Sequence, residues 1–244
     1  LPHLVEYKNI LGDLHIHSIY SDGSDSIETI AIHAKKLGYK YVGIADHSQS
    51  LKVAGGLSEE SLIKKQNEIQ QINKKLEGIT VLFGTECDIK TDGTLDYPDS
   101  VLAKFDFVIV GVHTALKMDA KQMGKRILSG IENEHANILA HPTGRLIGRR
   151  EPFKIDIENL IDAAKKTNTF LEINSFPDRL DLNNVHAKLA KEKKVKCVIG
   201  TDAHSIANMT YMEFGVATAR RGWQEKSDIL NTYSLNDLKK MLGR

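Results

Sequence analysis

Cysteine is scarce in this sequence, and the scarcity narrows the classes of protein that it can encode. The only two cysteines, Cys87 and Cys197, lie far apart, each within an apolar run. Free cysteine is among the most buried residue types, so we expect two buried, reduced thiols and a cytoplasmic protein. A structural zinc site built from several thiolates is excluded.

The sequence also lacks an excess of charge of one sign and lacks long apolar runs. Lysine and arginine number 33 and aspartate and glutamate 32, so the net charge is +1 and no global basic field indicates nucleic-acid binding. A local basic patch is left open. No apolar run approaches the roughly 20 residues of a membrane span, so we expect no contact with a membrane. The start, Leu1-Pro2-His3, lacks the pattern of a signal peptide and an initiator Met, so we expect a fragment or a processed chain.

The sequence does contain a regular alternation of short apolar runs with amphipathic stretches. The runs are continuously apolar and rich in β-branched residues, which is typical of buried parallel strands. The expected strands cover residues 10–16, 41–45, 80–87, 107–112, 137–140, 169–174 and 196–201.

Helical patterns fill the intervals between these strands. Ser58 is a candidate N-cap for one of them, and Gly38 stands where a helix commonly ends. The expected helices cover residues 26–37, 58–76, 119–131, 155–166, 183–194 and 209–220. Alternating strands and helices predict an α/β fold with a parallel sheet, in which seven strands close into a barrel within a single domain, 1–244. An open doubly wound sheet is the alternative.

Residues that bind metals follow the strands at one end. Six of the ten histidines and three carboxylates stand at or just after the ends of six strands. In α/β barrels and open parallel sheets, active sites form at the carboxyl ends of the strands, so we expect these side chains to converge. They are His15, His17, Asp46, His47, Glu86, His113, His141, Asp202 and His204.

The spacing within these motifs has a physical use. The pairs His15-x-His17 and Asp202-x-His204 place two side chains on the same side of an extended strand. Asp22 lies in the turn 21–24, which could fold it back over the strand end, although turns and helix caps also favour aspartate. Glu86 is the expected bridging ligand, because one carboxylate can bind two ions.

The mixture of neutral imidazole and carboxylate selects the metal. It favours Zn²⁺, Mn²⁺ or Fe²⁺, and it is too rich in histidine for Mg²⁺ or Ca²⁺. So many ligands imply more than one ion. Asp46 precedes His47, and alternation points it away from the ions, so we expect it to orient an imidazole.

Arginines follow the fifth and sixth strands. Arg145, Arg149 and Arg150 lie in the first of these loops and Arg179 lies in the second. The planar guanidinium suits phosphate oxygens, so we expect Arg145 and Arg179 to act in catalysis, together with Glu86 and Asp202. The alternative is a solvated arginine or a salt bridge to Glu151 or Asp178.

The motifs resemble those of the PHP (polymerase and histidinol phosphatase) superfamily. The resemblance is carried by Gly12–Ser18 with Ser21–Gly23, Ala45–Ser48, Gly84–Glu86, Gly111–His113, Ala140–Pro142 and Gly200–His204. It implies a distorted (β/α)7 barrel with a trinuclear metal centre, whose bridging hydroxide attacks phosphorus. It also implies three ligand sets: His15, His17, Glu86 and Asp202; Asp22, His47 and His204; and Glu86, His113 and His141.

Other segments resemble the C-terminal PHP domain of bacterial and archaeal family X DNA polymerases. They are 1–6, 55–57, 145–152, 174–181 and 219–223. This resemblance implies a Mn²⁺-dependent 3′–5′ exonuclease that acts on DNA 3′ ends, with a polymerase domain as a partner in the full-length protein. The chain itself has no polymerase domain and no helix-hairpin-helix.

Three other functions are left open by the sequence. A phosphomonoesterase acting on histidinol phosphate or a similar small ester would use the same metals. An amidohydrolase also opens with His-x-His, but Glu86 and Asp202-x-His204 count against it. A barrel that serves only as a scaffold would have lost ligands, and none is lost here.

Overall fold

In the computed structural model, which describes residues 2–243, the seven expected strands form one sheet. All neighbouring strands are parallel and lie in chain order from β1 to β7. The predicted strands are thus confirmed, although the fifth is reduced to two residues. Their bounds are β1 Gly12–Ile16, β2 Tyr41–Ile44, β3 Thr80–Asp88, β4 Phe107–Gly111, β5 Ile138–Leu139, β6 Phe170–Asn174 and β7 Cys197–Gly200.

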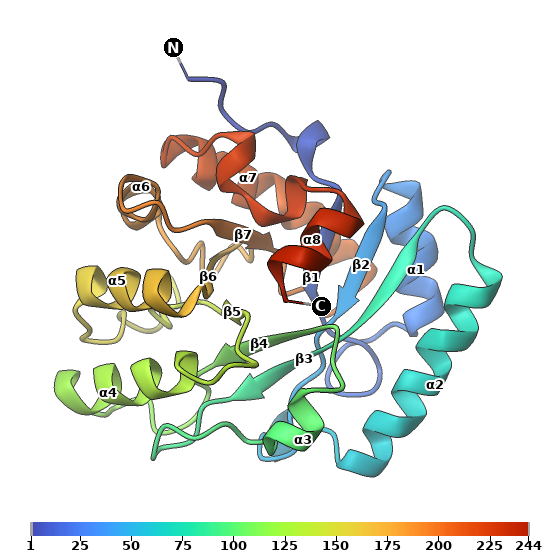
Figure 1. The fold of residues 1–244 in the computed structure, drawn as a ribbon, viewed down its shortest axis with the longest axis horizontal. Coiled ribbons are helices and arrows are strands. Elements are labelled where there is room, and N and C mark those ends of the chain that lie inside the picture. The colour runs from blue at the N-terminus through green and yellow to red at the C-terminus, as the bar shows by residue number, and fades with distance from the viewer. Residues whose placement is uncertain (1, 244) are drawn as a thin grey trace.

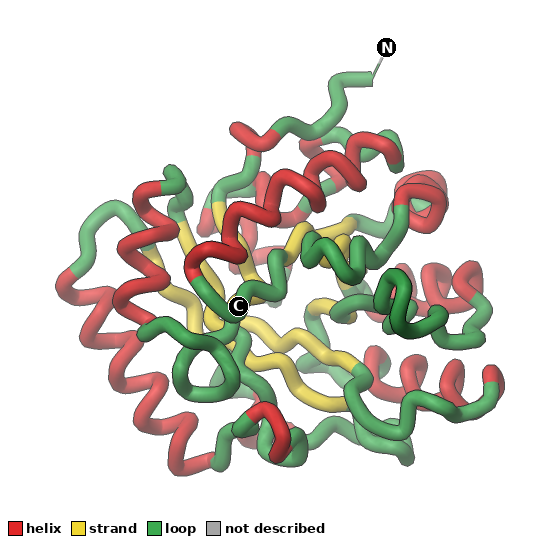
Figure 2. The backbone as a smooth tube through the Cα atoms, turned by 180° about the vertical axis from the view of Figure 1, so that it is seen from behind, coloured by secondary structure: helices red, strands yellow, loops and turns green. Residues whose placement is uncertain are grey.

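Helices form an outer layer around the strands (Figures 1 and 2). Side-chain oxygens cap their first turns where the sequence suggested, as when Ser58 accepts from the backbone N–H of Ser61. The short helices α3 and α8 were not expected. The α-helices are α1 Ile27–Lys36, α2 Glu59–Lys75, α3 Asp99–Leu102, α4 Ala120–Ile131, α5 Ile157–Thr167, α6 Asn184–Glu192, α7 Met212–Arg221 and α8 Leu235–Met241. The 3-10 helices are η1 Tyr7–Asn9, η2 Lys52–Ala54, η3 Ile206–Tyr211, η4 Lys226–Asp228 and η5 Leu230–Thr232.

The sheet closes into a barrel between β1 and β7. At the carboxyl ends of these strands, Ile16 pairs with Ala203, and the N–H of His17 donates to the Ala203 carbonyl at 2.8 Å. Toward the other end, the amide of Asn231 fills the gap: its Nδ2 donates to the carbonyls of Gly12 at 2.7 Å and Ile199 at 2.9 Å. The expected barrel is therefore confirmed, and a side chain completes its seam.

Apolar side chains fill the inside of the barrel and the layer between strands and helices. The inner cluster includes Leu14, Leu82 and Phe107 from the strands, and Leu238 and Leu242 from the last helical segment. In Figure 1, α8 accordingly lies over the middle of the strands. Because α8 closes the amino end of the barrel, access to its polar residues is confined to the carboxyl end.

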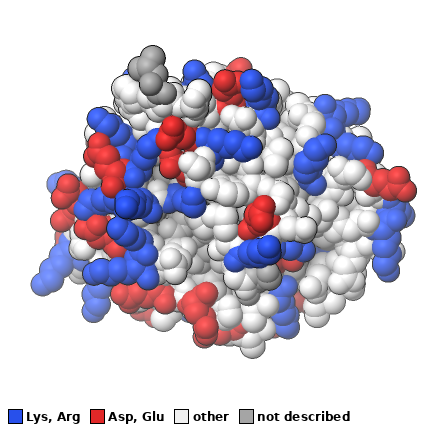
Figure 3. All heavy atoms as spheres, turned by 45° about the horizontal axis from the view of Figure 1, so that its top comes forward, with Lys and Arg blue, Asp and Glu red and all other residues white. Residues whose placement is uncertain are grey.

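The two cysteines lie in the buried positions that the sequence predicts. Cys87 and Cys197 are buried free thiols, and burial raises the pKa of each to about 12. Within residues 2–243, no helix has the length and apolar character needed to cross a membrane. On the face that Figure 3 presents, basic side chains lie interspersed with acidic ones.

Candidate metal centre

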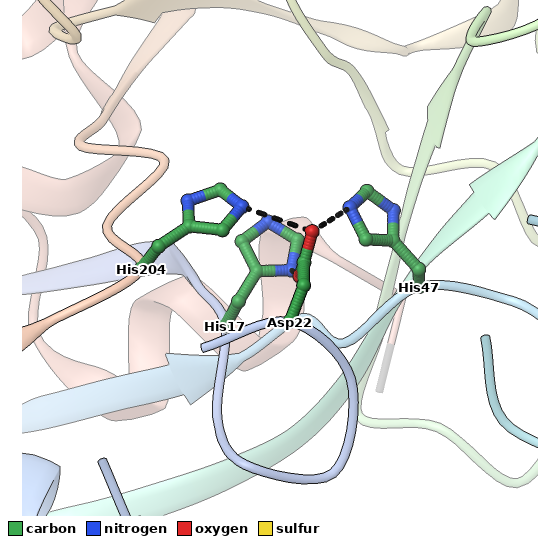
Figure 4. Close-up of side chains that lie close together, drawn as sticks. All are labelled: His17, Asp22, His47 and His204. Carbon is green, nitrogen blue, oxygen red and sulfur yellow. Dashed lines mark ion pairs between the residues drawn. The ribbon is translucent and has the colours of Figure 1, made fainter. Parts of the chain in front are cut away.

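The carboxyl ends of the strands bring the predicted ligands together in one buried cluster. Three overlapping groups offer ligand atoms that all lie within 4.8 Å of one another. Figure 4 shows one of them, in which three imidazoles from separate strand ends surround Asp22. The groups are His17, Asp22, His47 and His204; His15, His17, Glu86 and Asp202; and His47, Glu86 and His113.

Glu86 lies at the centre of this cluster and is almost fully buried. It lies two residues before the end of β3, and its two carboxylate oxygens face different imidazoles. Oε1 lies 2.9 Å from His141 Nε2 and 3.0 Å from His113 Nε2. Oε2 lies 3.2 Å from His47 Nδ1, 3.3 Å from His15 Nε2 and 3.5 Å from His17 Nε2. This arrangement is the one that a bridging carboxylate requires.

Asp22 returns to the strand ends through its turn. One oxygen, Oδ2, lies 3.4 Å from His204 Nε2 and 3.6 Å from His47 Nε2, while Oδ1 lies 3.7 Å from His17 Nδ1. Burial raises its pKa, but the neighbouring imidazoles outweigh that effect and lower the pKa to about 2. The carboxylate is therefore ionised and available to a cation.

The charges of the other ligands follow from the same contacts. Burial opposes ionisation of Glu86 and Asp202, yet the surrounding imidazoles hold the pKa of both carboxyls well below the usual range. Burial likewise opposes protonation of His113 and His204, but their carboxylate partners raise the pKa of each to about 9. Ionised carboxylates and imidazoles thus lie in direct contact throughout the cluster.

Two carboxylates behind the cluster fix the orientation of its imidazoles. Glu172 lies 2.6 Å from His15 Nδ1, and it also accepts from the backbone N–H of His141 at 2.7 Å. Asp88 lies 3.1 Å from His113 Nδ1. The two contacts to ring nitrogens, on His15 and His113, turn the second nitrogen of each ring toward Glu86. Both residues were missed from the sequence, although an acid inside an apolar strand such as β6 is a usable signal.

Asp46 does not contact an imidazole ring, contrary to expectation. Its carboxylate instead accepts hydrogen bonds from Ser18 and Ser21 and pairs with Lys65 at 2.9 Å. The reason is geometric: alternation points Asp46 away from His47, and the nearest polar groups on that side belong to another loop and to α2.

The arginines after β5 and β6 are placed differently from one another. Arg179 reaches the cluster, with Nε 3.2 Å from Asp202 Oδ2. Arg145 donates instead to the backbone carbonyls of Arg179, at 2.7 Å, and Leu180. Arg150 donates to the Gly144 carbonyl at 2.7 Å, and exposed Arg149 pairs with Asp178 at 3.4 Å. Only Arg179 among these four contacts a predicted ligand.

The cluster has the chemical character of a site for divalent ions. Buried imidazole nitrogens that face the carboxylates, on His15, His17 and His47, make no hydrogen bond with residues 2–243. Buried polar atoms are normally paired, so such a concentration of unpaired nitrogens beside ionised carboxylates fits cations as the missing partners. Imidazole with carboxylate suits Zn²⁺, Mn²⁺ or Fe²⁺.

Comparison with known proteins identifies the family. The PHP domain matches residues 13–176 of the sequence. The chain belongs to the PHP domain family. The predicted family and class, a metal-dependent phosphoesterase, are thereby confirmed.

Two relatives differ in how much of their own length the chain covers. The DNA polymerase/3'-5' exonuclease PolX of Bacillus subtilis (strain 168) is 48% identical over 241 residues, 99% of this chain but only 42% of that protein. A probable phosphatase of Thermoanaerobacter sp. (strain X514) is 30% identical over 231 residues, 90% of this chain and 89% of that protein. The chain thus spans less than half of the first relative and most of the second.

A solved structure supports the fold. Histidinol phosphate phosphatase of Lactococcus lactis, solved with zinc, L-histidinol and phosphate, superposes with a TM-score of 0.65 at 16% identity. The match covers 88% of this chain and 94% of that one. At this identity the likeness establishes the PHP barrel and nothing about the substrate.

Proposed function

We propose that this chain removes nucleotides from the 3′ ends of DNA by phosphodiester hydrolysis at a centre of three divalent ions. The observation that carries the proposal is the 48% identity to a PolX protein over nearly the whole chain. By the same comparison, we propose that residues 1–244 act as one phosphoesterase domain that accompanies a polymerase domain in a longer cytoplasmic protein.

The proposed ligands divide into three sets, two of which contain Glu86. The overlapping groups of close ligand atoms support the sets, with Glu86 common to two groups. His141 joins the third set through its 2.9 Å contact with Glu86. The sets are His15, His17, Glu86 and Asp202; Asp22, His47 and His204; and Glu86, His113 and His141.

Ions bound there would supply Lewis acidity and lower the pKa of water, so that hydroxide is available at neutral pH. The residues around them have separate tasks. Glu172 and Asp88 keep imidazoles in a ligating orientation. Arg179 has a buried Nη1 with no hydrogen-bond partner among residues 2–243 and lies beside Asp202, so it can donate to a phosphate oxygen.

A second candidate is hydrolysis of a small phosphate monoester. It is favoured by the probable phosphatase relative, which the chain matches over 89% of its length. The net charge of +1 also favours a small substrate, because affinity for DNA depends largely on neutralising phosphates with basic residues. The two candidates share the metal centre and differ in the substrate that reaches it.

A paired assay with added Mn²⁺ separates the candidates. We expect a single-stranded oligonucleotide labelled at its 5′ end to yield a ladder of shortened products, with slower phosphate release from histidinol phosphate and p-nitrophenyl phosphate. Glu86→Gln is the control: it should abolish turnover on every substrate and lower the bound metal by more than one ion per chain, since Glu86 belongs to two sets.

Each result has a distinct meaning. Phosphate release from the small esters without a ladder would replace the exonuclease by the phosphatase. A ladder that persists in Glu86→Gln would indicate a contaminating nuclease. Unchanged metal content in that variant would contradict the bridging role of Glu86.

A further inference from the structure

A buried lysine lies behind the cluster, in the outer helix α2. Lys65 lies three residues after Leu62 and four before Ile69, so it falls within the apolar stripe that α2 turns toward the sheet. Its side chain is 0% exposed. Lysine is almost never fully buried unless it is paired, so its partners should explain its position.

The ammonium group of Lys65 has three partners. Nζ donates to the backbone carbonyls of Ile44, at the end of β2, at 3.0 Å and of Gly84, in the middle of β3, at 2.9 Å. The third partner is Asp46 Oδ2 at 2.9 Å. An ammonium has three N–H donors, so all of them are used.

Asp46 in turn holds the loop that carries Asp22. Its Oδ1 accepts from the Ser18 N–H at 2.7 Å and from the Ser21 hydroxyl at 2.8 Å, and its Oδ2 accepts from the Ser18 hydroxyl at 2.9 Å. These two serines bracket the start of the loop between His17 and Asp22. A continuous series of contacts therefore runs from Lys65 through Asp46 to the loop of Asp22, and it is buried except at the loop.

Asp22 needs such support more than the other carboxylate ligands. Its side chain is 32% exposed, compared with 1% for Glu86 and 7% for Asp202. The loop is also tightly folded, because a Cβ at Gly23 would lie 2.2 Å from the His17 carbonyl oxygen. Packing does not fix Asp22, so its position depends on how the loop is tethered.

We propose that Lys65 and Asp46 are a positioning pair that sets the affinity of the group His17, Asp22, His47 and His204 for its ion. The inference rests on the ligand sets proposed above, but not on the choice of substrate. Removal of a residue that orients a metal ligand typically lowers metal affinity by 10- to 100-fold.

The test measures metal binding directly, without turnover. Lys65→Met keeps the length and removes the charge, and we expect affinity for one Mn²⁺ ion per chain to fall about tenfold or more. In an Asp22→Asn background, Lys65→Met should cause no further loss of that ion, because both changes act on the same group. Titration with Mn²⁺ and metal analysis after dialysis provide the readout.

A residue on the same helix supplies the matched control. Asn73 also bonds the backbone of β3, exchanging hydrogen bonds with Val81 at 2.8 Å in both directions, but it does not contact Asp46. Asn73→Ala should lower the melting temperature and leave all metal affinities unchanged. If Lys65→Met behaves like Asn73→Ala, the pair serves only the stability of the barrel and the proposal is overturned.

A milder variant covers the case in which Lys65→Met does not fold. Ser21→Ala removes one bond to Asp46 at a partly exposed position. Several-fold weaker binding of the same ion would support the tether, and unchanged binding would overturn it. Retention of every ion in Asp22→Asn would overturn the ligand set and the tether together, whereas an absent exonuclease activity would leave both intact.

Discussion

Two arginines near the cluster differ in what they contact. Arg179 lies against Asp202, whereas Arg145 holds the carbonyls of Arg179 and Leu180. Arg179 can therefore contact substrate, and Arg145 positions the loop that carries it. From the sequence, both arginines were expected to act in catalysis. Whether one contacts substrate and the other positions a loop can be tested by experiment.

Kinetics of single and double variants separate the two roles. Arg179→Ala should lower kcat/KM by roughly 100-fold, the loss of a charge-assisted contact of about 3 kcal/mol, without loss of metal. Arg145→Ala should lower it less, and should have no further effect in the Arg179→Ala background. Additive losses in the double variant would indicate that Arg145 contacts the substrate itself.

Asp181 is a buried carboxyl close to these arginines. Its Oδ2 accepts from the Thr143 N–H at 2.9 Å. Burial raises the pKa to about 6, from an ordinary value of 3.8, against the opposing effect of Thr143 and of the Arg145 and Arg179 charges. The folded state thus binds the proton more tightly than the unfolded state does.

Stability should therefore depend on pH at this residue. The stabilisation that Asp181 contributes is complete below about pH 4 and is lost as the pH rises through 6, a change of roughly 3 kcal/mol. Asp181→Asn keeps the acceptor and removes the titration. Denaturant unfolding from pH 4 to 7 should show the wild type losing stability relative to this variant, and parallel curves would disprove the assignment.

Among the secondary-structure elements, the 3-10 helix η5 connects the first and last strands of the barrel. It carries Asn231, whose side chain joins strands that do not pair along most of their length. The amide donates to Gly12 and Ile199 and accepts from the Ile199 N–H at 3.1 Å. An eighth strand would satisfy these groups in a complete (β/α)8 barrel, and here one side chain does so.

Loss of this amide should destabilise the barrel. Asn231→Ala leaves buried backbone groups of β1 and β7 unpaired, which costs about 3 kcal/mol. Asn133→Ala, which removes the bond to Asp99 and the bond from the His135 N–H outside the barrel, should cost only about 1 kcal/mol. Equal unfolding free energies for the two variants would show that water replaces the amide at the seam.

At the scale of the whole molecule, the sequence predicts the barrel and the converging ligands because both follow from local patterns. Continuously apolar runs indicate strands buried on both faces, and parallel strands place their carboxyl ends together. Glu86 could be assigned to the centre because it ends the third run. The turn around Asp22 was recognised from its composition alone.

The parts that could not be predicted depend on contacts between distant segments. In the sequence, Lys65 looks like a surface lysine at the edge of an apolar stripe. Only its contact with Asp46 in the folded structure shows that it is a buried lysine. Glu172 is one acid in a strand whose neighbours across the sheet are unknown from sequence. Asn231 and α8 follow the last βα unit. No repeating pattern there predicts that Asn231 joins β1 to β7 or that α8 covers the end of the barrel.

The seam also sets the order in which the molecule can be completed during synthesis. Within the barrel, His15 and His17 are made with β1, before the other strands, but their partners after β7 and the asparagine that joins the two strands are made after every strand. Translation must pass residue 231 before the ring of strands can close. If His15 and Asp202 share an ion, as proposed, that site is complete only after all seven strands of the barrel have been made.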